Sequence, residues 1–338
     1  MRAMVLQAPR SLEEVRTDPP NREDDEVMIR VTHGGICGTD LKIFEGQIAT
    51  QYPLVMGHEM VGSVIEHPNR SDLNDARVIV DPVLFCGKCY LCKNDLTNLC
   101  RAGGLLGRDK QGGFGEYVTV PSDNVYLLPD TVADHEAPLI QVLTTCMHAQ
   151  RRAGVSKDEA VVVMGLGVTG LLHMQLAKAY GANPVICVTK SPWKRDLAEA
   201  LGADAVYEAG DDARLGVEKL TGGRGVDLVI ECSGQLSVLA GAFDLVRFGG
   251  RVMPFGIHTE NKGDFPFYQL YFKEINIINA RAARSVDFPE AINLVRRAMV
   301  RLEPLVTHVE PLSELPNAIK MLKDNSVKRM KVIIDNSR

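Results

Sequence analysis

The sequence predicts an α/β protein in two parts, a barrel-like part made of strands followed by a parallel sheet that is doubly wound by helices. Over the first 120 residues, short and partly alternating apolar runs are interrupted by glycine and proline, which is typical of half-exposed strands. From about residue 155 onward, continuous apolar runs typical of buried parallel strands alternate with helical patterns. The length of 338 residues also exceeds what one ordinary core holds, so we expect two domains.

Composition places the chain among ordinary globular proteins and excludes several classes of function. Hydrophobic residues make up 45% and charged residues 24% of the sequence, as in a typical globular protein. The formal net charge of −5 gives no general attraction for polyanions, so nucleic acid is not an expected partner. No apolar run reaches the roughly 18 residues of a membrane helix, and Pro9 and Arg10 interrupt the start before a signal-peptide core could form. We therefore expect a cytoplasmic protein with no membrane partner.

Strand patterns recur through the first part. In the clearest of them, Val27, Ile29 and Val31 alternate with other residues and so share one face. The acidic run 23–26 is interpreted as an exposed turn without a function of its own. The expected strands are 3–6, 27–31, 61–65 and 77–80, followed by a returning strand over 112–121. Together they predict an all-β, barrel-like region.

A thiol, an imidazole and a carboxylate stand close together in the sequence between Cys37 and Glu59. They belong to the stretches Gly-Ile-Cys-Gly-Thr-Asp around Cys37 and Gly-His-Glu over 57–59. Sulfur, nitrogen and oxygen donors suit zinc, and a catalytic zinc typically has three protein ligands and one open position. Thr39 adds a hydroxyl that can pass a proton. Taken singly, Cys37 would more often be a buried apolar residue and His58 a structural one.

The most specific local signal is a group of four cysteines, Cys86, Cys89, Cys92 and Cys100. A tightly turned loop can direct the first three sulfur atoms at one metal ion, and the fourth can complete a tetrahedron. An ion bound by four thiolates has no free coordination position for a substrate. Their clustering in a large chain without a signal sequence favours metal thiolates over disulfides. An iron–sulfur cluster is the alternative, but the Cys-Pro of the bacterial ferredoxin pattern is absent because Arg101 follows Cys100. We expect a structural zinc site.

A helical pattern over 134–152 follows the strand patterns of the first part. Its most interesting polar residues are Gln141 and His148. Either side chain could simply be a hydrogen-bonded polar group that faces a cleft. We interpret His148 as structural.

A dinucleotide-binding pattern opens the second part. The continuous apolar run 160–164 leads directly into a G-x-G-x-x-G turn, and a helical pattern follows until Gly181. Glycines allow the backbone to approach a pyrophosphate closely, and the helix N-terminus supplies free N–H groups and a positive dipole end. The motif alone is weak, but between a buried strand and an amphipathic helix it is strong. The expected cofactor-binding residues of the turn are Gly165, Leu166, Gly167, Val168, Thr169 and Gly170.

Further strand patterns support a parallel sheet in the second part. The expected strands are 185–189, 226–231, 251–255 and 275–279, and helices alternate with them. Beyond Arg284, a helix over 288–300 and a last strand over 331–334 resemble neither a new domain nor a disordered tail. We expect this C-terminal segment to return to the first part.

The residues after the second strand of the parallel sheet distinguish the two nicotinamide dinucleotides. In an NAD site this strand ends in an acidic residue that binds the ribose hydroxyls, whereas this chain has Thr189 there. Lys190, Ser191, Lys194 and Arg195 follow, and their cations would attract a phosphate on the ribose. We therefore expect NADP, with NAD as the second choice. The alternative interpretation of Lys194 and Arg195 is an ordinary solvated helix face.

Together these motifs resemble those of the zinc-containing medium-chain dehydrogenase/reductase family, which includes alcohol, sorbitol, threonine and archaeal glucose dehydrogenases. The resemblance covers nearly the whole chain. It rests on the motifs around Cys37 and His58, the cysteines of 86–100 and the glycine turn over 165–170, in this order. The implied domains are a GroES-like β-barrel catalytic domain over 1–141 and 285–338, and a Rossmann doubly wound parallel-sheet domain over 142–284.

The resemblance also implies roles for individual residues. The implied ligands of the catalytic zinc are Cys37, His58 and Glu59. Thr39 would be the first carrier of the substrate proton. Gln141 stands where relatives of sorbitol dehydrogenase carry a glutamate that can join the metal, so it is a candidate further ligand. Lys42 stands where the family often has a proton-relaying histidine, and it could hold the ribose of the nicotinamide.

The implied reaction is reversible hydride transfer between an alcohol carbon and C4 of the nicotinamide of NADP(H). Zinc lowers the pKa of a bound water from about 15.7 to about 7, and a similar effect on an alcohol would make its alkoxide accessible at neutral pH. The expected substrates are polyols, sugars or secondary alcohols, and the expected metal content is two zinc ions per chain. Family members are usually homodimers or homotetramers joined through the edge of the Rossmann sheet, here the strand over 275–279.

Two other interpretations of the same fold stay open. One is a zinc-free quinone or enoyl reductase, which the retention of Cys37, His58 and Glu59 disfavours. The other is a non-catalytic NADPH-binding or zinc-binding protein. Such a protein would bind the cofactor but would not turn over any alcohol.

Overall fold

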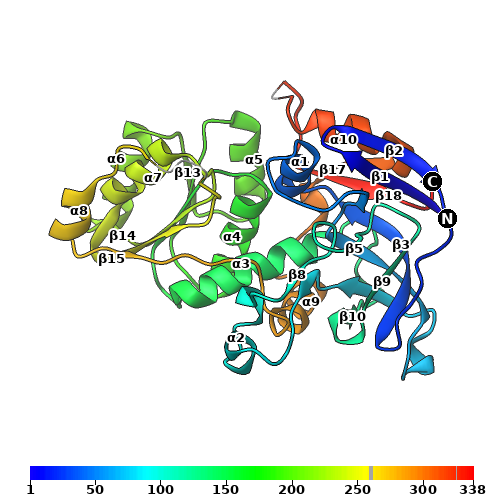
Figure 1. The fold of residues 1–338 in the computed structure, drawn as a ribbon. Coiled ribbons are helices and arrows are strands. Elements are labelled where there is room, and N and C mark those ends of the chain that lie inside the picture. The colour runs from blue at the N-terminus through cyan, green and yellow to red at the C-terminus, as the bar shows by residue number, and fades with distance from the viewer. Residues whose placement is uncertain (259–261, 325) are drawn as a thin grey trace. The chain divides into compact units, whose positions relative to one another are not determined.

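The computed structural model describes residues 1–258, 262–324 and 326–338, and Figure 1 shows its ribbon. The chain forms two compact units. The first unit contains Met1–Thr144, Ala282–Arg296 and Leu302–Arg338, and the second contains Thr145–Arg281 and Arg297–Arg301. The chain therefore leaves the first unit, forms most of the second, and then returns.

The first unit is built mainly on antiparallel sheets, in agreement with the predicted β-rich part. In the larger sheet the strands follow the order β10-β6-β5-β3-β18-β17, and β9 also pairs with β3. A smaller sheet has the order β2-β1-β4, and β7 pairs with β8. The bounds are β1 (Arg2–Ala8), β2 (Ser11–Arg16), β3 (Glu26–Gly35), β4 (Leu54–Val55), β5 (Glu59–Glu66), β6 (Arg77–Val80), β7 (Val83–Leu84), β8 (Gly104–Leu105), β9 (Tyr117–Pro121), β10 (Val125–Leu127), β17 (Val306–Pro311) and β18 (Lys331–Asp335).

Strand β3 pairs with β5, β9 and β18, and its apolar residues share the face that is buried. Val27, Ile29 and Val31 are all buried, whereas Arg30 between them is exposed. The last strand, β18, pairs antiparallel with β3, so that Ile333 lies opposite Gly35. The C-terminal segment therefore returns to the first unit, as predicted, and ends beside the metal-site motif.

The helices of the first unit are short. They are α1 (Gly38–Phe44), α2 (Tyr90–Lys93), α9 (Asp287–Arg296) and α10 (Leu315–Met321), with 3-10 turns at Ser71–Leu73, Thr97–Leu99, Ser122–Asn124, Glu303–Leu305 and Leu312–Glu314. Helix α3 (Leu139–Ala153) begins in the first unit and continues into the second. Among the described residues, none of the helices combines the length and the apolar character that crossing a bilayer requires.

Several elements are shorter than the sequence patterns predict. The strand expected over 275–279 covers only Asn276–Ile277, and the helix expected over 134–152 starts at Leu139. The strand expected over 112–121 starts only at Tyr117, and Gly112 instead donates its N–H to a carbonyl of β4 at 2.7 Å. The helix expected over 288–300 is α9, which ends four residues early. Ala298 has a φ of 54°, which lies outside the helical region of the backbone map.

The second unit contains the predicted parallel sheet with helices between its strands. Its strands follow the order β13-β12-β11-β14-β15-β16, and every pair is parallel. The strands are β11 (Val161–Met164), β12 (Val185–Val188), β13 (Ala205–Tyr207), β14 (Val226–Glu231), β15 (Val246–Pro254) and β16 (Asn276–Ile277). The helices are α4 (Val168–Ala179), α5 (Pro192–Ala200), α6 (Asp211–Thr221), α7 (Leu236–Leu245) and α8 (Phe267–Phe272). Strand β13 is too short to show a sequence pattern and was not predicted.

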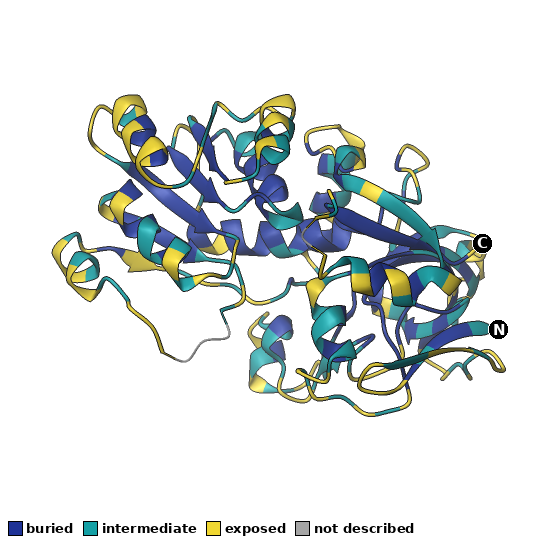
Figure 2. Cartoon of the chain, turned by 90° about the horizontal axis from the view of Figure 1, so that it is seen from above, coloured by how far each residue is buried: buried dark blue, intermediate teal, exposed yellow. Residues whose placement is uncertain are grey.

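The order of these strands determines where the second unit can bind a ligand. From β11 the chain builds outward through β12 to β13, and it then restarts on the other side of β11 with β14. Strands β11, β12 and β14 are buried along their whole length, which Figure 2 shows in dark blue, so ligands reach only their ends. In doubly wound sheets the binding crevice lies at the carboxyl ends, where the strand order reverses. Here that point lies between β11 and β14.

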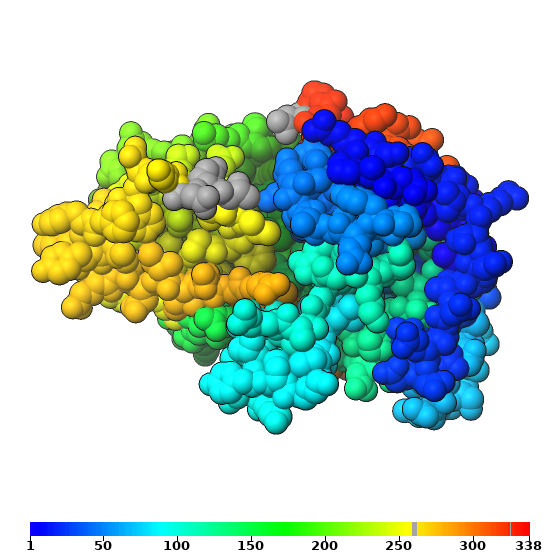
Figure 3. Space-filling view, viewed as in Figure 1, coloured from blue at the N-terminus to red at the C-terminus, as the bar shows by residue number. Residues whose placement is uncertain are grey.

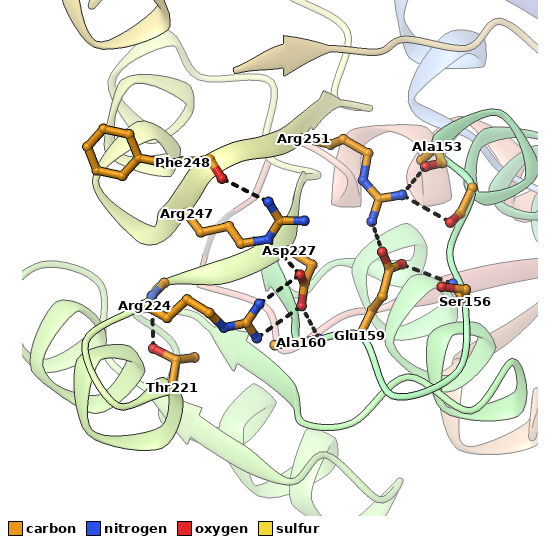
Figure 4. Close-up of polar contacts among 12 residues, drawn as sticks. Ala153, Ser156, Glu159, Ala160, Thr221, Arg224, Asp227, Arg247, Phe248 and Arg251 are labelled. Carbon is orange, nitrogen blue, oxygen red and sulfur yellow. Dashed lines mark hydrogen bonds and ion pairs between the residues drawn. The ribbon is translucent and has the colours of Figure 1, made fainter. Parts of the chain in front are cut away.

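Ion pairs brace the opposite, amino-terminal edge of this sheet (Figure 4). Asp227, near the start of β14, accepts N–H groups from Arg224 at 3.0 Å and Arg247 at 2.7 Å. Burial acts to raise the pKa of Asp227, but the two guanidinium groups lower it to about 2. Arg251 of β15 pairs with Glu159 in the same region. We assign this network a structural role, because every charge in it has an internal partner.

Candidate functional site

The predicted metal ligands of the first unit lie together in the structure. Strands β3 and β5 pair antiparallel with Gly35 opposite Glu59, so the last residue of β3, two positions before Cys37, lies opposite the first residue of β5. Cys37, His58 and Glu59 each offer a ligand atom, and these atoms lie within 4.8 Å of one another. His58 and Glu59 are buried, whereas Cys37 is partly exposed. One thiol, one imidazole and one carboxylate on converging backbone segments fit a zinc ion with an open position.

Asp40 organises two of these ligands, although the sequence patterns gave it no role. Its buried carboxylate accepts the backbone N–H of Cys37 at 2.8 Å, and its other oxygen lies 3.3 Å from His58 Nδ1 without hydrogen-bond alignment. Burial acts to lower the pKa of His58, but Asp40, together with Cys37, raises it well above its ordinary value. Because Asp40 faces Nδ1, the Nε2 atom is left as the nitrogen that can bind a metal. The spacing Cys-x-x-Asp at a helix start is the signal that could have revealed this role.

Lys331 is a second residue of the site that the sequence patterns missed. It lies on β18, and its ammonium group forms an ion pair with Glu59 although both side chains are almost fully buried. Gly35 makes this possible, because a Cβ at position 35 would overlap the Glu59 carboxylate and lie 2.8 Å from Lys331 Cε. No local pattern links Lys331 to Glu59, since the pair forms only when the C-terminal strand returns.

Three further predicted residues lie in the same unit. Thr39 and Lys42 are both half-buried on α1, which starts next to Cys37. Gln141 is buried in the first turn of α3. The proton-relay and metal-binding roles assigned to these residues stay predictions.

The four clustered cysteines form a second candidate metal centre. Their sulfur atoms lie 3.5 Å (Cys89–Cys92), 3.6 Å (Cys86–Cys100), 3.8 Å (Cys89–Cys100) and 4.0 Å (Cys86–Cys92) apart. Four Zn–S bonds of about 2.3 Å in a tetrahedron would give edges of about 3.8 Å. All four cysteines are free thiols. The spacing therefore fits a tetrahedral ion and excludes disulfides.

Backbone groups already favour thiolates in part of this cluster. The N–H groups of Lys88 and Cys89 lower the pKa of Cys86 to about 6, whereas burial raises the pKa of Cys92 to about 12. A cation at the centre would offset that cost of burying a thiolate. The segment that carries the cluster, cyan in Figure 3, forms a lobe on the face shown there.

The glycine turn of the second unit opens onto a cavity of about 440 Å³. Gly165 has a φ of 87°, and a Cβ at Gly170 would overlap Gly165 O, so these positions need glycine for the tight turn. A Cβ at Gly167 would meet nothing within 4 Å, which leaves room for a ligand at the N-terminus of α4. The lining residues are Met164, Gly165, Leu166, Gly167, Val188, Thr189, Lys190, Lys194, Ala209, Cys232, Ser233, Gln235 and Val238. Val168 and Thr169 form the first turn of α4.

The residues that the sequence predicts to select the cofactor differ in whether they line this cavity. Thr189 is buried at the end of β12, and its hydroxyl accepts the N–H of Ser191 at 3.3 Å. Thr189, Lys190 and Lys194 line the cavity. Arg195 instead pairs with Glu208 at 3.6 Å, so part of its charge is already compensated. Of the three predicted cations, Lys190 and Lys194 line the cavity, and Arg195 is not among its lining residues.

Comparison with known proteins shows which family this chain resembles over both units. Residues 23–130 match the alcohol dehydrogenase GroES-like domain, and residues 168–297 match the zinc-binding dehydrogenase family. The chain is 30% identical to D-arabitol-phosphate dehydrogenase of Enterococcus avium, covering 92% of this chain and 91% of that protein. It is 31% identical to L-galactonate-5-dehydrogenase of Escherichia coli K12, covering 93% of each chain. A protein of Sinorhizobium meliloti 1021, assigned as a zinc-binding dehydrogenase and solved with NADP, superimposes with a TM-score of 0.91 at 29% identity, covering 99% of this chain and 98% of that one.

The predicted fold class and family are thereby confirmed over most of the chain. The GroES-like and zinc-binding dehydrogenase matches fall on the first unit and, for the most part, on the second. The relatives are named as dehydrogenases of polyol phosphates and sugar acids. The chain therefore belongs to the zinc-type medium-chain dehydrogenase family and is an oxidoreductase of the alcohol dehydrogenase class.

Proposed function

We propose that this protein is a zinc-dependent dehydrogenase that transfers a hydride reversibly between NADP(H) and a polyol, a sugar or a secondary alcohol. The observation that carries the proposal is the convergence of Cys37, His58 and Glu59, with ligand atoms within 4.8 Å of one another. Such a donor set leaves a coordination position free for a substrate oxygen. In this proposal the first unit is the catalytic domain and the second binds the cofactor.

Each residue of the site then has a defined task. A zinc ion held by Cys37, His58 and Glu59 would supply Lewis acidity, which lowers the pKa of an alcohol hydroxyl. Thr39 takes the proton from the substrate side, and Lys42, on the same helix, is the next group outward. Gln141 is a candidate further ligand, and as a neutral amide it would leave the site less negative than a glutamate would.

Asp40 and Lys331 contact the proposed metal ligands, and we assign them no contact with the substrate. Asp40 holds His58 with Nε2 available. Lys331 holds the Glu59 carboxylate and compensates its charge. Their contribution is therefore to keep the donors in place before the metal and the substrate arrive.

The proposed cofactor is NADP, with NAD as the second choice. Thr189 replaces the acidic residue of NAD sites, and Lys190 and Lys194 line the same cavity. A close pair of unit charges near a protein surface interacts by about 4 kcal/mol before desolvation losses. If about a third of that survives, the selectivity for the ribose phosphate is about tenfold. The NADP-bound relative supports this choice.

The proposed metal content is two zinc ions per chain, one at Cys37, His58 and Glu59 and one at the four cysteines. The second site would be structural, because four thiolates close the tetrahedron. The sulfur separations of 3.5 to 4.0 Å support this assignment.

We also propose that the protein is a homodimer or homotetramer joined at the β16 edge of its parallel sheet. β16 ends the strand order, and Ile277 on it is 44% exposed. An edge strand of this kind offers unpaired backbone groups to another chain. Exposed aromatic residues beside it form one cluster, in which Tyr268 stacks on Phe272 and Phe248 meets Phe272 edge-on. Contiguous exposed apolar clusters often mark an interface.

The experiment that tests the proposed function combines metal analysis with a turnover screen. The purified protein is expected to hold two zinc ions and to reduce NADP with at least one polyol, aldose or secondary alcohol. Fewer than two zinc ions would favour a zinc-free reductase. Cofactor binding without turnover of any alcohol would favour a non-catalytic binding protein, and a wide preference for NAD would contradict the assignment of Lys190 and Lys194.

A further inference from the structure

A glycine-rich segment over 112–115 lies alongside the stretch of chain that leads to His58. The N–H of Gly113 donates to Gly57 O at 2.9 Å, which joins the two segments through their backbones. Phe114 carries the one side chain of the segment, and it is fully buried. The sequence pattern gave this residue only a place in a returning strand. The structure instead places it against the backbone that carries a proposed metal ligand.

The ring of Phe114 packs against two glycines. A Cβ on Gly57 would lie 3.0 Å from three atoms of the ring, so the ring covers this glycine directly. A Cβ on Gly34 would lie 3.2 Å from Cε1 of the same ring. Gly57 immediately precedes His58, and Gly34 lies three residues before Cys37. One side chain therefore contacts both segments that carry the proposed ligands.

The contact at Gly57 leaves little room for adjustment. Gly57 has a φ of 94°, a conformation that favours glycine, so the ring meets bare backbone at this position. Protein interiors are close-packed, and a change of volume at one side chain is felt by its neighbours. A smaller side chain at position 114 would therefore let the backbone before His58 shift.

The C-terminal segment holds Phe114 in turn. Asn336 follows β18 and is buried, and its side-chain amide donates to Gly113 O at 2.8 Å and to Gly115 O at 2.7 Å. These two carbonyl groups flank Phe114 on both sides. The N–H of Met4 also donates to Phe114 O at 2.9 Å. The position of the ring is thus fixed by contacts that do not involve the proposed ligands.

We propose that Phe114 is a positioning residue for the metal site at Cys37, His58 and Glu59. Its ring sets the separation between the end of β3 and the residue before His58, and with it the positions of the three donors. The inference rests on the proposed function, since it requires that these donors bind zinc. A ring with a structural role alone would stabilise the first unit without favouring this metal site over the four cysteines.

The test measures the release of zinc from the loaded protein at equilibrium with a chelator of rising concentration. Cys37→Ser should lack one release step, and that step belongs to the site at Cys37. In Phe114→Leu this step should occur at a free zinc concentration about tenfold higher, as the loss of other residues that hold metal ligands predicts. The step of the four cysteines should stay within about twofold of wild type. No shift in Phe114→Leu, or an equal shift of both steps, would overturn the proposal.

Phe288→Leu provides the matched control, because Phe288 is another fully buried phenylalanine of the first unit. Its ring stacks on Tyr126 of β10, the terminal strand of the larger sheet, with centroids 4.7 Å apart. The same loss of volume at this position should leave both release steps within about twofold of wild type. If Phe288→Leu shifts the Cys37 step as far as Phe114→Leu does, general loosening of the first unit explains the effect and the proposal is wrong.

Gly34→Ala added to Phe114→Leu should restore part of the lost affinity. The φ of Gly34 is not positive, so alanine fits the backbone, and its methyl group enters the space that Cε1 of the ring leaves. The double variant should bind zinc about threefold more tightly than Phe114→Leu, as expected for two residues in contact. A double variant that binds no more tightly would contradict the role of the ring in setting the separation.

Asn336→Leu is a further variant in case Phe114→Leu does not fold. It removes the two hydrogen bonds that flank Phe114, so it should weaken zinc binding at the Cys37 site and leave the step of the four cysteines unchanged. A wild-type protein without a step that Cys37→Ser removes would refute the proposed metal site and this inference with it. Unshifted steps in the Phe114 and Asn336 variants would refute this inference alone.

Discussion

At the scale of single residues, the proposed metal site depends on groups outside its proposed ligand set. Glu59 is buried, and a buried carboxylate needs a positive partner in the absence of an ion. Lys331 is that partner, and it reaches Glu59 from the last strand of the chain. The first unit can therefore fold with its ligands in place before zinc binds. The buried ion pair lets the carboxylate stay charged during that stage.

Replacing Lys331 with methionine tests this account. In the zinc-free protein, Lys331→Met should lower the free energy of unfolding of the first unit by about 3–5 kcal/mol, because Glu59 is left buried without a partner. In the zinc-loaded protein the loss should be smaller, since the ion then faces the carboxylate. Urea unfolding of both forms measures the difference.

An exposed pair in the same unit gives the matched control. Arg70 and Asp72 are both exposed, and their charged groups lie 2.7 Å apart. Arg70→Met should therefore change the free energy of unfolding little in either form. Equal losses for Lys331→Met with and without zinc would show that Lys331 acts through packing and not through charge.

At the scale of elements, the cysteine lobe and the end of β3 should respond differently to the loss of a ligand. Cys89→Ser should remove one zinc ion per chain and lower the unfolding midpoint by on the order of 10 °C, because a structural zinc contributes folding free energy directly. Cys37→Ser should also remove one zinc ion, but it should abolish turnover and change the midpoint much less. Elemental analysis, calorimetry and a turnover assay on the same samples separate the two outcomes. A Cys89→Ser protein with unchanged zinc content would exclude the lobe as a metal site.

Another element-scale contact joins β6 to the returning C-terminal segment. Asp81 follows β6 and is fully buried, and it accepts hydrogen bonds from Val83 N–H and the Ser285 hydroxyl, both at 2.9 Å. Burial and the nearby Asp287 carboxylate raise its pKa from 3.8 to about 6 despite these two donors. The folded protein thus binds this proton more tightly than the unfolded chain does.

The pH dependence follows from the sign of this shift. The folded pKa lies above the unfolded one, so the stabilisation is present below about pH 4 and is lost as pH rises through 6. Asp81→Asn stays neutral at every pH. Its free energy of unfolding relative to wild type should therefore rise by about 2–3 kcal/mol between pH 4 and pH 7.5. Urea unfolding of both proteins across this pH range measures this difference in the free energy of unfolding. A difference that falls with rising pH would contradict the raised pKa of Asp81.

At the scale of the whole molecule, the sequence predicted the sites whose residues lie close together in the chain. It did not predict the contacts that form between distant segments. The Cys37 motif, the cysteine group and the glycine turn each lie within one turn or loop, so their chemistry shows in the spacing. Strand β13 and the end of α9 were missed or misplaced because three-residue strands and positive-φ breaks leave weak patterns. Lys331 was missed because it joins the site only through the sheet.

Assembly is the prediction that belongs to the whole molecule. Tyr271 on α8 is 80% exposed beside the β16 edge, and Tyr90 on α2 of the first unit is 77% exposed. If copies of this chain join through the β16 edge, Tyr271→Asp should shift the protein toward monomer, because burying an unpaired charge at an interface is costly. Tyr90→Asp should leave the assembly unchanged, although the two side chains are equally accessible in the chain. Light scattering over a concentration series measures both, and a monomeric wild type, or a monomer produced only by Tyr90→Asp, would exclude this interface.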